Sequence, residues 1–327
     1  MLDDTGDNIL WIPDLMSSTN RPPARGATSS KKSPSKRQKI GHKSVGSEDE
    51  GILEPMRIAK AMARAGLCSR RDGERWIAEG RVCLNGKVLD TPAVKVSTKD
   101  IILVDGSPLP VAAPVQLWRY HKPRGCVTTH KDPQERSTVF DGLPDYLPRV
   151  ISIGRLDYNT EGLLLLTNDG ALARHMELPA TGWLRRYRVR AYGRISKTDL
   201  ESLKDGITID GVLYGPVLAT LDSVQGGNTW LTLGLREGKN REVRRILEHL
   251  KLKVNRLIRI SYGPFQLLDL APGEVEPVRR RVLADQLGNK IARELHIIDT
   301  PHPVTRPHHR QESKPKAPLK SKKGARD

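Results

Sequence analysis

The feature that most constrains the fold is a run of four consecutive leucines, residues 163–166, near the middle of the 327-residue chain. Gly162 precedes the run, and the turn-forming sequence Thr-Asn-Asp-Gly at 167–170 ends it. A short apolar run between turn signals is typical of a buried β-strand. Asp157 lies on the segment that leads into this strand. The sequence therefore predicts a carboxylate on a loop that enters the core.

Asp157 has two possible roles. An Asp before a strand ordinarily caps a turn, whereas a carboxylate near the core must be held by a cation or by hydrogen-bond donors. The string at residues 154–170, G-R-L-D-Y-N-T-E-G-L-L-L-L-T-N-D-G, closely resembles the active-site motif of the RsuA/RluB group of RNA pseudouridine synthases. The resemblance implies that Asp157 is catalytic. It also implies that Arg155 binds the substrate, either in the space vacated by the target base or at a flanking phosphate.

Two further segments match this group. Residues 122–129, K-P-R-G-C-V-T-T, match the opening of its catalytic domains, and the strand predicted at 184–193 contains Tyr187. A strand tyrosine is ordinarily a packed ring with a solvated hydroxyl group, but the resemblance implies that Tyr187 is a catalytic-site residue lying against the target base. Three arginines of the same strand are expected to position the RNA backbone without reading bases: Arg186, Arg188 and Arg190.

The string E-G-K-N-R-E-V-R-R at residues 237–245 predicts a basic loop entering a helix. Its Gly-Lys pair lacks the spacing of a phosphate-binding loop, which excludes that interpretation. The string resembles the motif of the same group whose arginine pairs with the catalytic Asp. The resemblance implies that Arg244 is this catalytic cation and that Val243 and Arg241 contact the substrate. Because the Asp157 carboxylate must be charged in a dry pocket, Arg244 is expected to keep it ionised.

The net charge of +17 indicates a polyanionic partner, either nucleic acid or an anionic membrane surface. No run of ~18 apolar residues is present, and the N-terminus does not have the pattern of a secretory signal. Three isolated cysteines, Cys68, Cys83 and Cys126, fit a reducing cytosol better than disulfides or a metal site. We therefore expect no structural metal, no cofactor, no membrane partner and a cytoplasmic location.

Residues 56–112 form a predicted small domain. The pattern is a short helix near residue 58, a second helix capped by Ser69 with Asp72 three residues later, and a hairpin turning at Asn85-Gly86. Residues 56–110 contain ten Lys or Arg and six Asp or Glu, a net charge of 10 − 6 = +4. The pattern resembles the alpha-L RNA-binding domain, which implies that its clustered cations bind RNA rather than simply forming a solvated face: Arg57, Lys60, Arg64, Arg70, Arg71, Arg81 and Lys87.

The predicted fold class is α+β. A disordered tail at 1–55 precedes the alpha-L domain at 56–112, a catalytic domain with a mixed, mostly antiparallel sheet spans 113–300, and a basic disordered tail occupies 301–327. The tails are assigned from their content of Ser, Pro, Gly and Lys.

The predicted function is isomerisation of a specific uridine in ribosomal RNA to pseudouridine, acting on free RNA or on a precursor ribosomal particle as a monomer. The strings at 237–245 and 257–263 are closer to the RluB branch, which favours large-subunit RNA over small-subunit RNA. One alternative is a non-catalytic RNA-binding assembly factor, against which the intact Asp157, Tyr187 and Arg244 argue. Another is an RNA methyltransferase, which would require a glycine-rich cofactor loop that the sequence lacks.

Overall fold

The computed structural model describes residues 55–298. Both predicted tails therefore lie outside the described residues, apart from Pro55. The first part of the described chain is built from two short helices and several short strands. In chain order these are β1 (Met56–Arg57), α1 (Ile58–Arg64), α2 (Arg70–Ala78), β2 (Val82–Leu84), β3 (Lys87–Val88), β4 (Lys95–Val96), β5 (Ile102–Val104) and β6 (Ser107–Pro108).

Local sequence signals determine these elements. Ser69 caps α2 through a reciprocal capping box, in which its hydroxyl accepts from the Asp72 amide at 3.0 Å. Asn85, with a φ of 50°, makes the predicted turn between β2 and β3. The predicted short helix near residue 58 is confirmed as α1, which ends at Arg64; Leu67, beyond its end, is 39% exposed. The buried apolar residues of this part form a core of their own.

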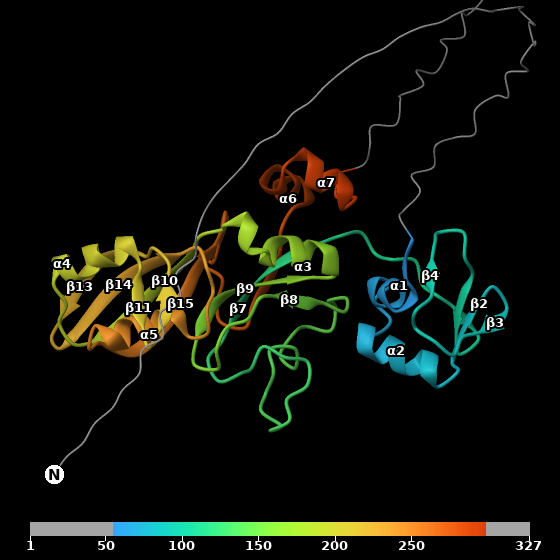
Figure 1. Ribbon diagram of the computed structural model, residues 1–327, viewed down its shortest axis with the longest axis horizontal. Coiled ribbons are helices and arrows are strands. Elements are labelled where there is room, and N and C mark those ends of the chain that lie inside the picture. Colours follow the sequence, from blue (N-terminus) through green and yellow to red (C-terminus); the bar gives the residue numbers. More distant parts are fainter. Residues whose placement is uncertain (1–54, 299–327) are drawn as a thin grey trace, which may run out of the picture. The chain divides into compact units, whose positions relative to one another are not determined.

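The second part is organised around one large sheet (Figure 1). Its strands are β7 (Leu117–Lys122), β8 (Ile151–Ile153), β9 (Glu161–Thr167), β10 (Arg185–Tyr192), β13 (Leu218–Gln225), β14 (Asn228–Leu235), β15 (Lys253–Tyr262), β16 (Phe265–Gln266) and β17 (Val275–Pro277). Its helices are α3 (Gly170–Glu177), α4 (Lys197–Ser202), α5 (Glu242–His249), α6 (Arg280–Leu287) and α7 (Asn289–Glu294). A separate hairpin, β11 (Ile207–Ile209) with β12 (Val212–Tyr214), was not anticipated from the sequence.

The sheet has the order β13-β14-β10-β15-β9-β7-β17, with β8 paired to β9 and β16 paired to β15. Within the described residues, the β9–β15 pair is parallel and the other pairs of this sheet are antiparallel. The mixed, mostly antiparallel sheet predicted from the sequence is therefore confirmed. The leucine run lies in β9, where all four side chains are completely buried.

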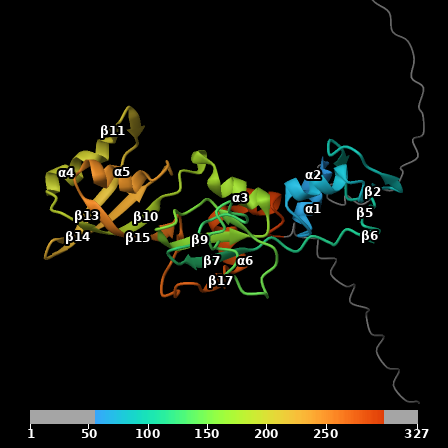
Figure 2. The same cartoon turned by 90° about the horizontal axis from the view of Figure 1, so that it is seen from below.

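Helices pack on both faces of the sheet, but on different halves. Figures 1 and 2 show α4 and α5 beside the half formed by β10, β13, β14 and β15, and α3 beside β8 and β9. Strand β10 shows the sidedness of its half: Val189 and Ala191 are buried in the same core as the apolar side chains of α5, and the alternate residues are exposed. The two helix layers therefore lie over opposite faces of one continuous sheet.

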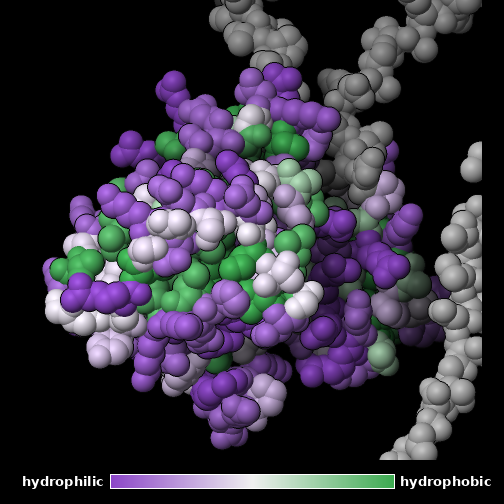
Figure 3. All heavy atoms as spheres, turned by 60° about the vertical axis from the view of Figure 1, so that its left-hand side comes forward, coloured by the Kyte–Doolittle hydropathy of each residue, from purple (hydrophilic) through white to green (hydrophobic). Residues whose placement is uncertain are grey.

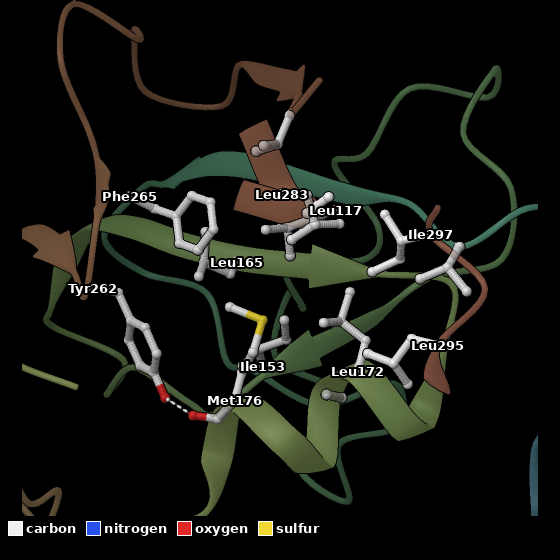
Figure 4. Close-up of a cluster of buried hydrophobic side chains, with 14 of the residues drawn as sticks. Leu117, Ile153, Leu165, Leu172, Met176, Tyr262, Phe265, Leu283, Leu295 and Ile297 are labelled. Carbon is white, nitrogen blue, oxygen red and sulfur yellow. Dashed lines mark hydrogen bonds between the residues drawn. The ribbon is translucent and has the colours of Figure 1, made fainter. Parts of the chain in front are cut away.

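The core under α3, α6 and α7 is stabilised by a buried hydrogen bond as well as by apolar packing. Figure 4 shows Leu117, Leu165 and Phe265 among its apolar side chains. The hydroxyl group of Tyr262 donates to the carbonyl oxygen of Met176 at 2.9 Å, so the end of β15 is attached to the end of α3. This bond satisfies a buried hydroxyl that would otherwise be costly to bury.

Exposed apolar side chains lie among polar ones on the half that carries α4, with Leu213 66% and Leu218 54% exposed. Figure 3 turns this side forward and shows hydrophobic patches bordered by hydrophilic side chains. Across residues 55–298, none of the helices has the length and apolar character needed to span a membrane.

The parallel pairing of β9 with β15 requires glycine at position 162. Gly162 has a φ of 104°, and a Cβ there would lie 2.4 Å from the Arg259 carbonyl oxygen. We expect Gly162→Ala to lower the free energy of unfolding by about 2 to 4 kcal/mol, since both backbone strain and a backbone clash would result. Urea denaturation of the full chain measures this change.

Gly142→Ala is the matched control, because a Cβ at Gly142 has no neighbouring atom within 4 Å. Equal stabilities of the two variants would contradict the close-approach argument.

Candidate active site

The loop that carries Asp157 is held by its own backbone. Each of its five consecutive carbonyl oxygens, from residue 156 to residue 160, accepts a hydrogen bond. The donors are Thr128 Oγ1 to Leu156 O (3.0 Å), Thr160 N to Asp157 O (3.0 Å), Gly125 N to Tyr158 O (2.9 Å), Arg244 Nη2 to Asn159 O (3.1 Å) and Lys122 Nζ to Thr160 O (2.9 Å). Four of the five donors come from segments distant in sequence, so the loop has little freedom to move.

The K-P-R-G-C-V-T segment supplies three of these donors. Lys122 is completely buried, and Thr128 both donates to the Leu156 carbonyl group and accepts from the Leu156 amide at 3.3 Å. Gly125 adopts a φ of 82°, which a residue with a side chain rarely adopts, and this turn directs its amide toward Tyr158. The spacing of the motif thus corresponds to three attachment points along one loop.

The Asp157 side chain is half-buried. Among residues 55–298 its carboxylate has no hydrogen-bond or ion-pair partner, so the direct pairing with Arg244 expected from the sequence is not formed. Arg244, 8% exposed, instead donates to the carbonyl oxygens of Asn159 and Val254. Burial lowers the pKa of Arg244, as does the positive charge of Arg241, whereas the negative charge of Asp157 opposes the shift. Arg244 therefore supports the Asp157 loop and lies within electrostatic reach of its carboxylate.

Several cations lie in the region of this carboxylate. Burial lowers the pKa of Lys122, and nearby negative groups, Asp157 among them, oppose that shift. Arg124 and Arg241, both exposed, lower the pKa of Arg244 through their positive charges. These groups place several positive charges in one region, which makes it electropositive and suited to an anionic ligand.

The other residues predicted for the catalytic domain fall into three environments. Tyr187 is half-buried and packs against two core clusters, on the face of the sheet that α5 covers. Val243 is 5% exposed and belongs to the core beneath α5. Arg241 is exposed at the N-cap of α5 with a left-handed φ of 50°, and Arg155 is exposed two residues before Asp157. The structure thus brings Asp157, Arg241 and Arg244 to one region.

Comparison with known proteins identifies the two domains of the chain. The family model described as RNA pseudouridylate synthase matches residues 116–249, and the model described as S4 domain matches residues 56–102. A protein of Rickettsia felis named as an uncharacterized RNA pseudouridine synthase is 48% identical over 230 residues, which cover 69% of this chain and 98% of that protein.

This chain belongs to the RNA pseudouridine synthase family. Ribosomal large subunit pseudouridine synthase B of Salmonella typhimurium is 36% identical over 278 residues, covering 74% of this chain and 94% of that protein. A solved structure described as a crystal structure of pseudouridylate synthase aligns with a TM-score of 0.50 at 26% identity, covering 71% of this chain and 100% of that one. An S4 domain followed by a pseudouridine synthase domain is therefore the architecture of the chain.

The cations predicted to bind RNA through the S4 domain of this synthase are not equivalent. Five are exposed and two are half-buried, the latter being Arg64 and Arg81. Arg81 makes two hydrogen bonds to the Asp105 carboxylate, at 2.9 and 2.6 Å, and lies 4.6 Å above the Trp76 ring. Arg81 therefore stabilises the domain itself. The exposed members are Arg57, Lys60, Arg70, Arg71 and Lys87.

Glu242 is a buried residue of the synthase domain that sequence reasoning missed. It opens α5, is 5% exposed, and accepts a hydrogen bond from the Lys239 amide at 2.9 Å. Burial raises its pKa to about 7, and the neighbouring Glu237 adds to this shift. The sequence around Glu242 does not indicate a raised pKa, because the burial that causes the shift results from the tertiary packing of α5. Lys122, Gly125 and Thr128 were also not assigned individual roles, although their motif was recognised.

We expect Thr128→Val to loosen the Asp157 loop. The substitution keeps the size of the side chain but leaves both the amide and the carbonyl group of Leu156 without this partner, which should cost about 1 to 3 kcal/mol of unfolding free energy. Hydrogen exchange should accelerate at the amides of residues 156–160, measured by mass spectrometry. Thr129→Val is the control, because the Thr129 hydroxyl bonds only within its own turn, to Lys131. Equal exchange in both variants would contradict the loop assignment.

Glu242 should make stability depend on pH. Its folded-state pKa, about 7, lies above the ordinary value of 4.5 for a glutamate. The penalty for ionising it is absent below about pH 4.5, grows as the pH rises, and is complete above about pH 7, reaching about 3 kcal/mol at most. Glu242→Gln should therefore be more stable relative to wild type at pH 8 than at pH 5, measured by urea denaturation. Glu248→Gln, an exposed change on the same helix, should show no such difference. If the stability of both variants relative to wild type changed equally between pH 5 and pH 8, the burial argument would be refuted.

Proposed function

We propose that this synthase isomerises a specific uridine of large-subunit ribosomal RNA to pseudouridine, with Asp157 as the catalytic carboxylate. The observation that carries the proposal is a half-buried carboxylate without a side-chain partner among residues 55–298, on a loop whose five consecutive carbonyl oxygens are all bonded. Such a group is held in one position and free to act on a ligand. A carboxylate committed to a structural ion pair would not be free in this way.

The reaction breaks the N1–C1′ glycosidic bond, turns the base, and joins C1′ to C5. The proton lost from C5 is balanced by one gained at N1, so no electron is transferred and no co-substrate is consumed. Asp157 serves either as the nucleophile or as the base that deprotonates C2′. In both roles its charge is needed, and Arg244 and Lys122 supply the positive surroundings that favour it.

The target uridine must leave its stack before it can react, at a cost of a few kcal/mol. In this proposal Tyr187 lies against the extruded base, and Val243 packs beneath the same region. Arg155 occupies the vacated space or grips a flanking phosphate, and Arg241 binds the substrate backbone. The exposure of both arginines, and the left-handed backbone that projects Arg241 from the start of α5, support these assignments.

Large-subunit ribosomal RNA is proposed from the names of relatives such as ribosomal large subunit pseudouridine synthase B. The S4 domain, proposed to span residues 56–112, would bind this RNA through its exposed cations, and the catalytic domain is proposed to span 113–300. We also propose that the protein acts in the cytoplasm as a monomer, on free RNA or on a precursor particle.

We expect Asp157→Ala to lower the rate of pseudouridine formation by at least about 10²- to 10⁴-fold, since it removes the reacting carboxylate. Large-subunit ribosomal RNA transcript would be treated with each protein, and pseudouridine would be detected by reverse-transcription stops after carbodiimide labelling. One new stop that is present with wild type and absent with the variant is the expected result.

Asp285→Asn, an exposed change on α6, controls for loss of an acidic residue. Stops that persist in Asp157→Ala would remove Asp157 from the catalytic role. Stops that form on small-subunit RNA and not on large-subunit RNA would overturn the substrate. If neither RNA nor a precursor particle is modified while salt-sensitive binding remains, a non-catalytic assembly role would replace the proposal.

A further inference from the structure

The arginines of β10 lie on the face of the sheet opposite the candidate active site. Side chains alternate along a strand, and Val189 and Ala191 point into the core beneath α5. Tyr187 shares their side, while Arg186, Arg188 and Arg190 are exposed on the other. Because α5 also carries Arg244, whose guanidinium group reaches the Asp157 loop, these arginines do not line that loop.

Neighbouring strands extend this surface. Arg190 is paired with Trp230 on β14 and with Arg256 on β15, and Arg188 lies 5.0 Å from the centroid of the Trp230 ring. Tyr192, 60% exposed, continues the arginine row along β10. We call this surface the arginine face, defined by Arg186, Arg188, Arg190, Tyr192, Trp230 and Arg256.

The positive charge of the arginine face is only partly compensated. Arg188 lies 4.0 Å from Asp222, and Arg256 forms a hydrogen-bonded ion pair with Glu161 at 2.6 Å. Arg186 and Arg190 have no ion-pair or hydrogen-bond partner among residues 55–298. An ordinary solvated face would interleave both signs of charge. Here two of the four arginines have no nearby carboxylate.

We propose that the arginine face binds a segment of the substrate RNA outside the segment that enters the active site, an inference that rests on the proposed function. Arginines on alternate residues of one strand are about 7 Å apart and in line, so successive guanidinium groups can contact successive phosphates of an extended strand. Tyr192 offers an exposed ring on which a base can stack, and the guanidinium plane of Arg188, which lies over the Trp230 ring, offers a second flat surface. Arginine and aromatic rings on one open sheet surface fit single-stranded nucleic acid better than an acidic peptide, which has no bases to stack.

The test compares two double variants that each remove two exposed arginines. Arg186→Gln/Arg190→Gln alters the arginine face, and Arg281→Gln/Arg293→Gln alters α6 and α7 with the same change in net charge. Binding of large-subunit ribosomal RNA transcript would be measured over a range of salt concentrations. For the first pair, the slope of log K against log salt should fall by about 1.4 to 1.8, because two phosphate contacts are lost. The second pair should retain the wild-type slope.

Cross-linking gives a second, independent readout. With transcript containing 4-thiouridine, cross-links to peptides of β10 or β14 are expected in the wild-type protein and should weaken in the Arg186→Gln/Arg190→Gln variant. Equal slopes for the two double variants, or cross-links confined to the S4 domain and the Asp157 loop, would overturn the proposal. In that case an acidic protein partner would be the remaining occupant with matching charge.

The outcome can be separated from that of the proposed function. Binding needs no turnover, so the salt dependence can be measured in the Asp157→Ala background. A reduced slope without pseudouridine formation by wild type would retain the RNA surface and reject the catalytic proposal. Pseudouridine formation by wild type with an unchanged slope in the arginine variant would retain the catalytic proposal and reject the RNA surface.

Discussion

The parallel contact between β9 and β15 is the constraint on which the rest of the catalytic part depends. It joins the two halves of the sheet, and Gly162 permits it because the backbone of Arg259 occupies the space of a side chain. Arg259 also donates to the Leu163 carbonyl oxygen at 2.7 Å, which adds a side-chain bond across the junction. Since the Asp157 loop runs directly into β9, the same junction determines where the carboxylate lies relative to α5.

Much of this arrangement could be predicted from the sequence. The leucine run, the capping residue Ser69 and the turn at Asn85 are local signals, and each corresponds to the element it predicted. The sequence motifs also identified the segments that meet around Asp157. The β11–β12 hairpin was not predicted, although its Asp210-Gly211 pair has the positive φ angles of a type I′ turn and is flanked by apolar residues, a recognised hairpin signal.

Long-range contacts were the other limit. The motif around Arg244 suggested a direct pairing with Asp157, but its guanidinium group is occupied by the carbonyl oxygens of Asn159 and Val254. Likewise, alternation along β10 predicts two faces, but only the packing of α5 identifies which face lies toward the Asp157 loop. The protonation preference of Glu242 depends on burial and on Glu237, both of which result from the tertiary fold.

The bonds that hold the Asp157 loop have a consequence for how the sequence of such an enzyme can vary. Backbone oxygens, rather than the side chains of residues 158 and 159, make the attachments, and both of these side chains are exposed. Their identity can therefore change without loss of the bonds that hold the loop. The surface beside Asp157 can therefore vary in sequence while the position of the Asp157 backbone is kept.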